Sequence, residues 1–86
     1  MSTQSTVTHP LFVPVTFEGK EHTSIILRRP KTKDVQAIDK KEGITQTIEM
    51  IARLSGWPHE AVGELDVTDL SSIGDILESF MKRRDT

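Results

Sequence analysis

Residues 45–55 of this 86-residue chain carry apolar side chains at the spacing of a helix. At about 100° per residue, apolar side chains cover more than half of its circumference. They are Ile44, Ile48, Met50, Ile51, Ala52 and Leu54. Glu49 and Arg53 are expected to pair on the remaining wet side. A helix this apolar must be covered from two sides, and a chain of this length allows one domain, so we expect the helix at the centre of a single fold.

Two segments before this helix have the character of strands. Residues 11–18 are rich in β-branched and aromatic residues, and Pro14 removes one hydrogen-bond donor, which is typical of an edge strand. Residues 22–28 carry the apolar run Ile25–Leu27, and Gly19-Lys20 supplies a turn between the two segments. The sequence therefore predicts a β-hairpin, one face of which packs on the helices because a lone hairpin is unstable in water.

Two shorter helical segments flank the apolar helix. Thr32 is expected to cap a helix over residues 33–41, with Asp34 in its first turn and Gly43 as its C-terminal stop. After the apolar helix, residues 59–64 are expected to form a short helical turn.

The last helix has a clear start. Asp66 is expected to cap it, and Asp69 lies in its first turn. Its apolar residues recur at helical spacing; they are Leu70, Ile73, Ile76, Leu77, Phe80 and Met81. The predicted fold class is α+β, with an N-terminal β-hairpin followed by three main helices and one short helical turn. Residues 1–10 are Ser/Thr-rich and are expected to be a disordered arm, and residues 11–86 a single small domain.

No pattern in the chain points to catalysis. His59-Glu60 begins like a zinc-protease motif, but Gly63 stands where the second histidine ligand would be. Cysteine is absent, so neither a disulfide nor a thiolate metal site can form. We therefore expect no catalytic residues, no metal site and no cofactor, and we predict that the protein is not an enzyme.

A helix-turn-helix resemblance deserves a closer test. Ala52, Gly56 and Val62 have the small–Gly–aliphatic spacing with which such motifs cross two helices tightly. The recognition helix would fall at residues 58–64, which hold two glutamates and no Lys or Arg, and the net charge of the chain is −2. Carboxylates repel phosphate, so we expect no nucleic-acid partner; a small DNA-binding regulator stays open as an alternative. No apolar run exceeds three residues, so no membrane partner is expected.

Two surface features suggest binding of another protein. The basic residues Arg28, Arg29, Lys31 and Lys33 are interpreted first as a solvated connection and second as a patch for an acidic partner.

The second feature is the wide apolar arc of the last helix, which spans about 140° and so exceeds what one neighbouring helix covers. Ile76, Phe80 and Met81 should therefore stay accessible. Trp57 is interpreted first as a plug between two helices and second as an exposed anchor. These four are the predicted partner-binding residues.

Several short features follow one another in a fixed order over residues 25–81. They are a Leu…Arg-Pro segment that leads into a helix, Ala37-Ile38-Asp39, Leu54-Ser55-Gly56 with Pro58, Leu65-Asp66 with Asp69, and a closing helix that ends near Phe80. In this order they resemble the small phage tail assembly chaperones of P2-like and Mu-like contractile-tail phages and prophages.

The resemblance implies a function that composition alone does not indicate. Such chaperones bind the tape measure protein, a very long helical protein of the growing tail, and assist the recruitment of tail tube protein. They act in the cytoplasm of the bacterial host and leave before the virion is complete. A homo-oligomer and a minor structural tail protein both stay open as alternatives.

Overall fold

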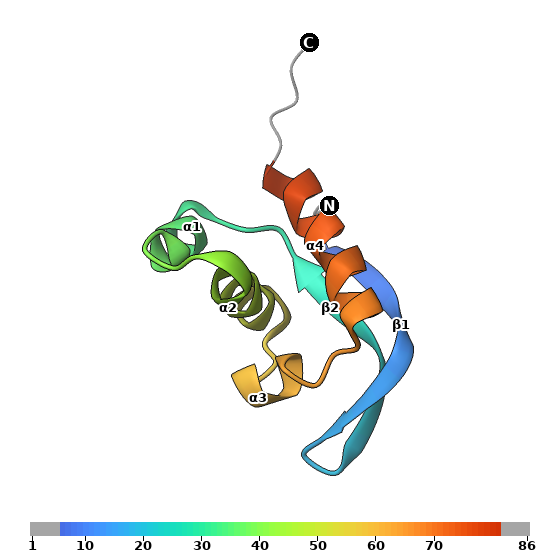
Figure 1. Ribbon diagram of the computed structural model, residues 1–86. Coiled ribbons are helices and arrows are strands. Elements are labelled where there is room, and N and C mark those ends of the chain that lie inside the picture. The colour runs from blue at the N-terminus through green and yellow to red at the C-terminus, as the bar shows by residue number, and fades with distance from the viewer. Residues whose placement is uncertain (1–5, 82–86) are drawn as a thin grey trace.

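The structure is a computed structural model that describes residues 6–81. A two-stranded antiparallel hairpin is followed by helices (Figure 1). The elements are β1 (Thr6–Phe17), β2 (Lys20–Arg28), α1 (Thr32–Ile38), α2 (Gly43–Ser55), α3 (His59–Val62) and α4 (Val67–Met81). The predicted α+β architecture, a hairpin before the helices, is confirmed.

The hairpin closes at a two-residue turn. Glu18 and Gly19 both have positive φ, 53° and 76°, as a type I′ turn requires, and Phe17 pairs with Lys20 across it. The register is interrupted by a bulge between Pro10 and Val15. The bulge contains Pro14, which cannot donate to a strand ladder.

β1 begins earlier than the sequence indicated. Val7 and His9 pair with Leu27 and Ile25, so residues 6–10 are a strand and their prediction as a disordered arm was wrong. Residues 6–10 contain few apolar side chains, so the sequence shows little sign of a strand. Their partners in β2, Ile25, Ile26 and Leu27, are the apolar residues of this part of the hairpin. Residues 1–5, the rest of the predicted arm, lie outside the described part of the chain.

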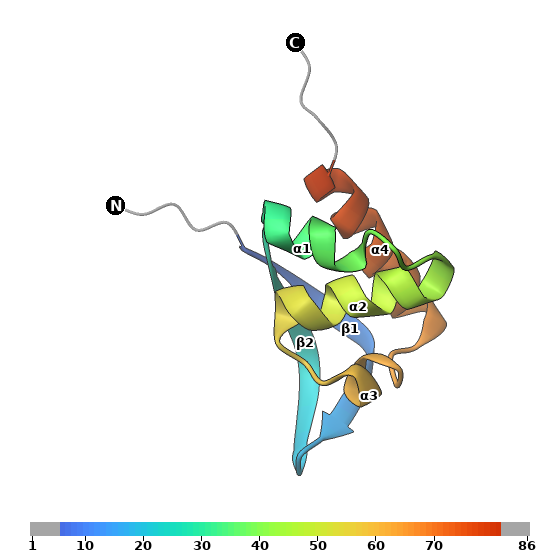
Figure 2. The same ribbon diagram turned by 90° about the vertical axis from the view of Figure 1, so that its left-hand side faces the viewer.

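The helices gather on one side of the hairpin (Figures 1 and 2). On that side Val15, Ile25 and Leu27 are buried, whereas Phe12 and Ile26 are exposed. One buried cluster draws on both strands and all four helices. α2 packs on β2 and α4 packs on β1.

α2 is central, as predicted. Met50, Ile51, Ala52 and Leu54 are buried, and the helix ends at Gly56, whose φ of 80° is left-handed. Its start differs from the prediction, because Gly43 begins α2 and does not end the preceding helix.

α1 is shorter than predicted and is capped differently. Thr32 is its first residue, Lys31 takes the N-cap position, and the helix ends at Ile38. Asp34 explains the change, because its carboxylate accepts the backbone N–H of Lys31 at 2.7 Å. The predicted cap at Thr32 was therefore wrong.

The cap of α4 was predicted correctly. Asp66 Oδ2 accepts the backbone N–H of Thr68 at 2.9 Å, as an N-cap carboxylate does.

α3 is a single turn, His59–Val62, that ends two residues before the predicted Glu64. None of the helices over residues 6–81 is long and apolar enough to cross a membrane.

Candidate partner-binding site

A buried carboxylate attaches α4 to the bulge of β1. Asp69 accepts the backbone N–H of Phe12 at 2.8 Å and 3.0 Å, and that of Val13 at 3.1 Å. His9 Nε2 lies 3.2 Å from the same carboxylate. The bulge frees these two N–H groups from the ladder, and Asp69 satisfies them. The start of α4 is thereby fixed against the middle of β1.

Burial and hydrogen bonding act in opposite directions on Asp69. Burial alone would raise its pKa, but the N–H groups of Phe12 and Val13, together with His9, outweigh burial and hold the pKa below its ordinary value. Asp69 is therefore a carboxylate at neutral pH despite its position in the interior.

A second buried carboxylate joins β2, α1 and α2. Asp34 binds Arg28 through two contacts of 2.8 Å and 3.0 Å, and Arg53 Nε at 3.1 Å. The Arg28 guanidinium is the largest cause of a strongly lowered pKa at Asp34, and the same contact raises the pKa of Arg28. Arg28 therefore has an internal partner, which removes it from the predicted basic patch.

The predicted pair between Glu49 and Arg53 was wrong. Arg53 turns to Asp34, and Glu49 instead contacts His59 Nε2 at 2.7 Å. Arg53 Nε satisfies an acceptor site of the Asp34 carboxylate, which is fully buried and so has no water to donate to it.

An open groove lies between the first half of α2 and the second half of α4. It is bounded by Ile38 of α1, by Gln46, Thr47 and Met50 of α2, and by Gly74, Leu77, Glu78 and Met81 of α4, and its volume is about 420 Å³. We name it the helical groove. Its apolar members are Ile38, Met50, Leu77 and Met81, and its polar members are Gln46 and Thr47 on the α2 wall and Glu78 on the α4 wall.

The structure places the four predicted partner-binding residues differently. Met81 is 46% exposed and lines the helical groove. Ile76 and Phe80 are half-buried against the core, and Arg29 lies over the Phe80 ring at 5.5 Å. Trp57 is buried beside the Phe17 and His22 rings of the hairpin, which disfavours an exposed anchor; these contacts are to the two strands and not between two helices.

Sequence reasoning missed most of the helical groove. Gln46 and Thr47 were assigned to no site, and Gly74 and Glu78 were passed over within α4. The available signal was Gly74, a residue without a side chain in the interior of an otherwise apolar-striped helix, which indicates close approach or open space.

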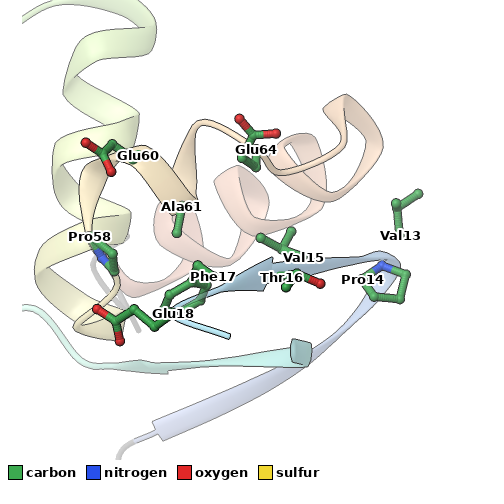
Figure 3. A pocket seen from close by; sticks show the side chains of 10 residues that line it. All are labelled: Val13, Pro14, Val15, Thr16, Phe17, Glu18, Pro58, Glu60, Ala61 and Glu64. Atoms are coloured by element: carbon green, nitrogen blue, oxygen red, sulfur yellow. The ribbon is translucent and has the colours of Figure 1, made fainter. Parts of the chain in front are cut away.

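A second groove lies between β1 and α3. It is lined by residues 13–18 of β1 and its turn, and by Pro58, Glu60, Ala61 and Glu64, and its volume is about 720 Å³. We name it the acidic groove. Figure 3 shows Ala61 pointing from α3 toward the strand, whereas Glu60 and Glu64 project from the opposite wall at the rim.

The described residues also bear on metal binding and on DNA reading. Within residues 6–81, no group of three His, Cys, Asp or Glu side chains could hold a metal ion. α3, where a recognition helix would fall, is one turn long and carries exposed Glu60, which disfavours binding in a major groove.

Comparison with known proteins gives one result. The family model described as "Phage tail assembly chaperone proteins, E, or 41 or 14" matches residues 8–82. No match was found among curated proteins or among solved structures. The matched range includes β1 from Thr8 onward, β2, α1 to α4, both buried aspartates and both grooves. The chain therefore belongs to the family of phage tail assembly chaperones.

Proposed function

We propose that this chain binds the tape measure protein of a contractile-tail phage in the cytoplasm of the bacterial host, and that it leaves before the virion is complete. On this proposal its role is binding, without catalysis, and it also assists the addition of tail tube protein. The observation that carries the proposal is the helical groove. It lies open between two helices that are each attached to the hairpin by a separate buried aspartate.

The shape and chemistry of the helical groove suit an amphipathic helix. Such a helix lays its apolar face into an apolar groove, and its polar face meets the rim. The floor here offers Met50 and Met81, whose flexible thioethers adapt to varied apolar surfaces. Gln46 Nε2 already donates to the carbonyls of Ile38 and Lys41, so the Gln46 carbonyl oxygen and the Glu78 carboxylate can accept hydrogen bonds from an occupant. A long helical protein presents this kind of surface repeatedly along its length.

Binding at the helical groove can be tested with two variants of one helix. Met81→Glu puts a carboxylate into the groove, where a bound apolar face would leave it without a partner. Val67→Glu adds the same group at the other end of α4, at a side chain that is 78% exposed and outside the groove. Each variant is co-expressed with tagged tape measure protein from the same phage, and the chaperone recovered with the tag is measured.

We expect Met81→Glu to lower recovery by about tenfold or more, a loss of about 1.4 kcal/mol of binding free energy, while Val67→Glu matches the wild type. Equal recovery of all three would remove the helical groove as the site. Absence of wild-type chaperone from the tagged fraction would contradict binding of the tape measure protein itself.

A further inference from the structure

The acidic groove has a strongly one-sided charge. Glu18, Glu60 and Glu64 lie at its rim, and no Lys, Arg or His is among its lining residues. Its floor is apolar, with Val15 and Ala61 almost fully buried. A groove of this kind fits a segment whose side chains combine a long apolar stem with a cationic end, as those of Arg and Lys do.

The backbone of β1 adds an unpaired edge to this groove. In a hairpin closed by a two-residue turn, the flanking pair exchanges both hydrogen bonds, and the next pair does not. Phe17 and Lys20 flank the turn here, so the N–H and C=O of Thr16 point away from β2. Thr16 lines the acidic groove, so an extended segment could pair with this edge while its side chains reach the glutamates.

The sequence contains one segment with matching chemistry. Lys82, Arg83 and Arg84 follow α4 directly, and they are the only three consecutive cations in the chain. We name residues 82–84 the basic tail.

The basic tail cannot reach the acidic groove of its own copy. α4 has 15 residues and is therefore about 22 Å long, and α3 lies near its start. Figures 1 and 2 show the end of α4 and α3 at opposite ends of the molecule. Three extended residues span at most about 11 Å, so only the tail of another copy can occupy the groove.

We propose that the basic tail of one copy docks in the acidic groove of a second copy. The contact joins two different surfaces of the same chain, so it is heterologous and can repeat from copy to copy. It uses no residue of the helical groove, so self-association through the tail and binding at the helical groove are separate properties.

Charge reversal tests the acidic groove. Self-association of the full chain is measured by sedimentation equilibrium at low and high salt, for wild type, for E60K/E64K and for K40E/K41E. The side chains of Glu60, Glu64, Lys40 and Lys41 are all exposed. Lys40 and Lys41 lie outside the acidic groove, so K40E/K41E is a matched control for the reversal of two charges. We expect E60K/E64K to weaken self-association by about tenfold or more, K40E/K41E to leave it near the wild-type value, and added salt to weaken the wild type.

A charge swap identifies the occupant. K82E/R83E/R84E should lose self-association by the same factor, and this triple variant mixed with E60K/E64K should recover it. A wild type that stays monomeric at low salt, a control that loses as much as E60K/E64K, or a mixture that does not recover would each overturn the proposal. Far-UV circular dichroism of every variant verifies the fold. If docking of the basic tail is disproved, the proposed binding of the tape measure protein is not affected, because it uses the helical groove.

Discussion

At the scale of single residues, the two buried aspartates determine how the helices lie on the hairpin. Each sits in the first turn of a helix, where a carboxylate ordinarily interacts with its own helix dipole. Here each reaches outward instead: Asp69 to the bulge of β1, and Asp34 to Arg28 of β2 and Arg53 of α2. Their hydrogen bonds and ion pairs therefore act between elements distant in the sequence.

Removing the charge of Asp69 should cost stability. Asp69→Asn keeps the shape but offers one carbonyl oxygen where two carboxylate oxygens accept the N–H groups of Phe12 and Val13. We expect the free energy of unfolding in urea to fall by about 2 kcal/mol, as is usual when buried donors lose a charged acceptor. Asp75→Asn changes an exposed carboxylate on the same helix and should change it by less than about 0.5 kcal/mol. Equal effects of the two variants would mean that the Asp69 contacts contribute nothing specific.

The same aspartates predict a dependence of stability on acidity. The folded-state pKa of Asp34 and of Asp69 lies below the ordinary value of 3.8, so their ionised forms stabilise the fold. This stabilisation is complete at neutral pH and is lost as pH falls through that value toward the folded pKa. We expect the free energy of unfolding to decline below about pH 5, and to decline less steeply in Asp34→Asn. An Asp34→Asn curve parallel to the wild type would contradict this assignment.

At the scale of elements, the sequence predicts those whose signals are local. The apolar arc of α2 and the cap at Asp66 both depend on neighbouring residues, and both were predicted correctly. The hairpin was predicted from β-propensity and a glycine turn.

What the sequence did not reveal depends on contacts across the chain. The first residues of β1 become a strand because they pair with residues 25–28, which no local pattern shows. The roles of Asp34 and Asp69 were missed because helix capping already explained both carboxylates. The helical groove was missed because it arises from the distance between α2 and α4, which the separate attachments of these helices determine.

Two glycines of the helices should respond to alanine in opposite ways. Gly56 ends α2 at a φ of 80°, so Gly56→Ala forces a side chain into a left-handed conformation and should lower the free energy of unfolding by about 1 kcal/mol. Gly74 lies within α4 with open space around its Cα, so Gly74→Ala should raise it by up to about 1 kcal/mol. Thermal melts monitored by circular dichroism measure both. Shifts of the same sign would contradict this interpretation of the two sites.

At the scale of the whole molecule, the hairpin supports helices that border the helical groove and the acidic groove. The helical groove is lined by polar and apolar surface in equal share, and the acidic groove is charged and bordered by a strand edge. The arrangement suits a protein whose task is to hold another chain during assembly.

The most direct measurement of this task is the soluble fraction of the tape measure protein when it is synthesised in a bacterial host with and without this chain. The proposed function predicts that the tape measure protein is mostly in the soluble fraction when the wild-type chain is present, and mostly in the pellet when the chain is absent or carries Met81→Glu. Val67→Glu should behave as the wild type. A tape measure protein whose solubility is the same with and without the chain would contradict the proposed function.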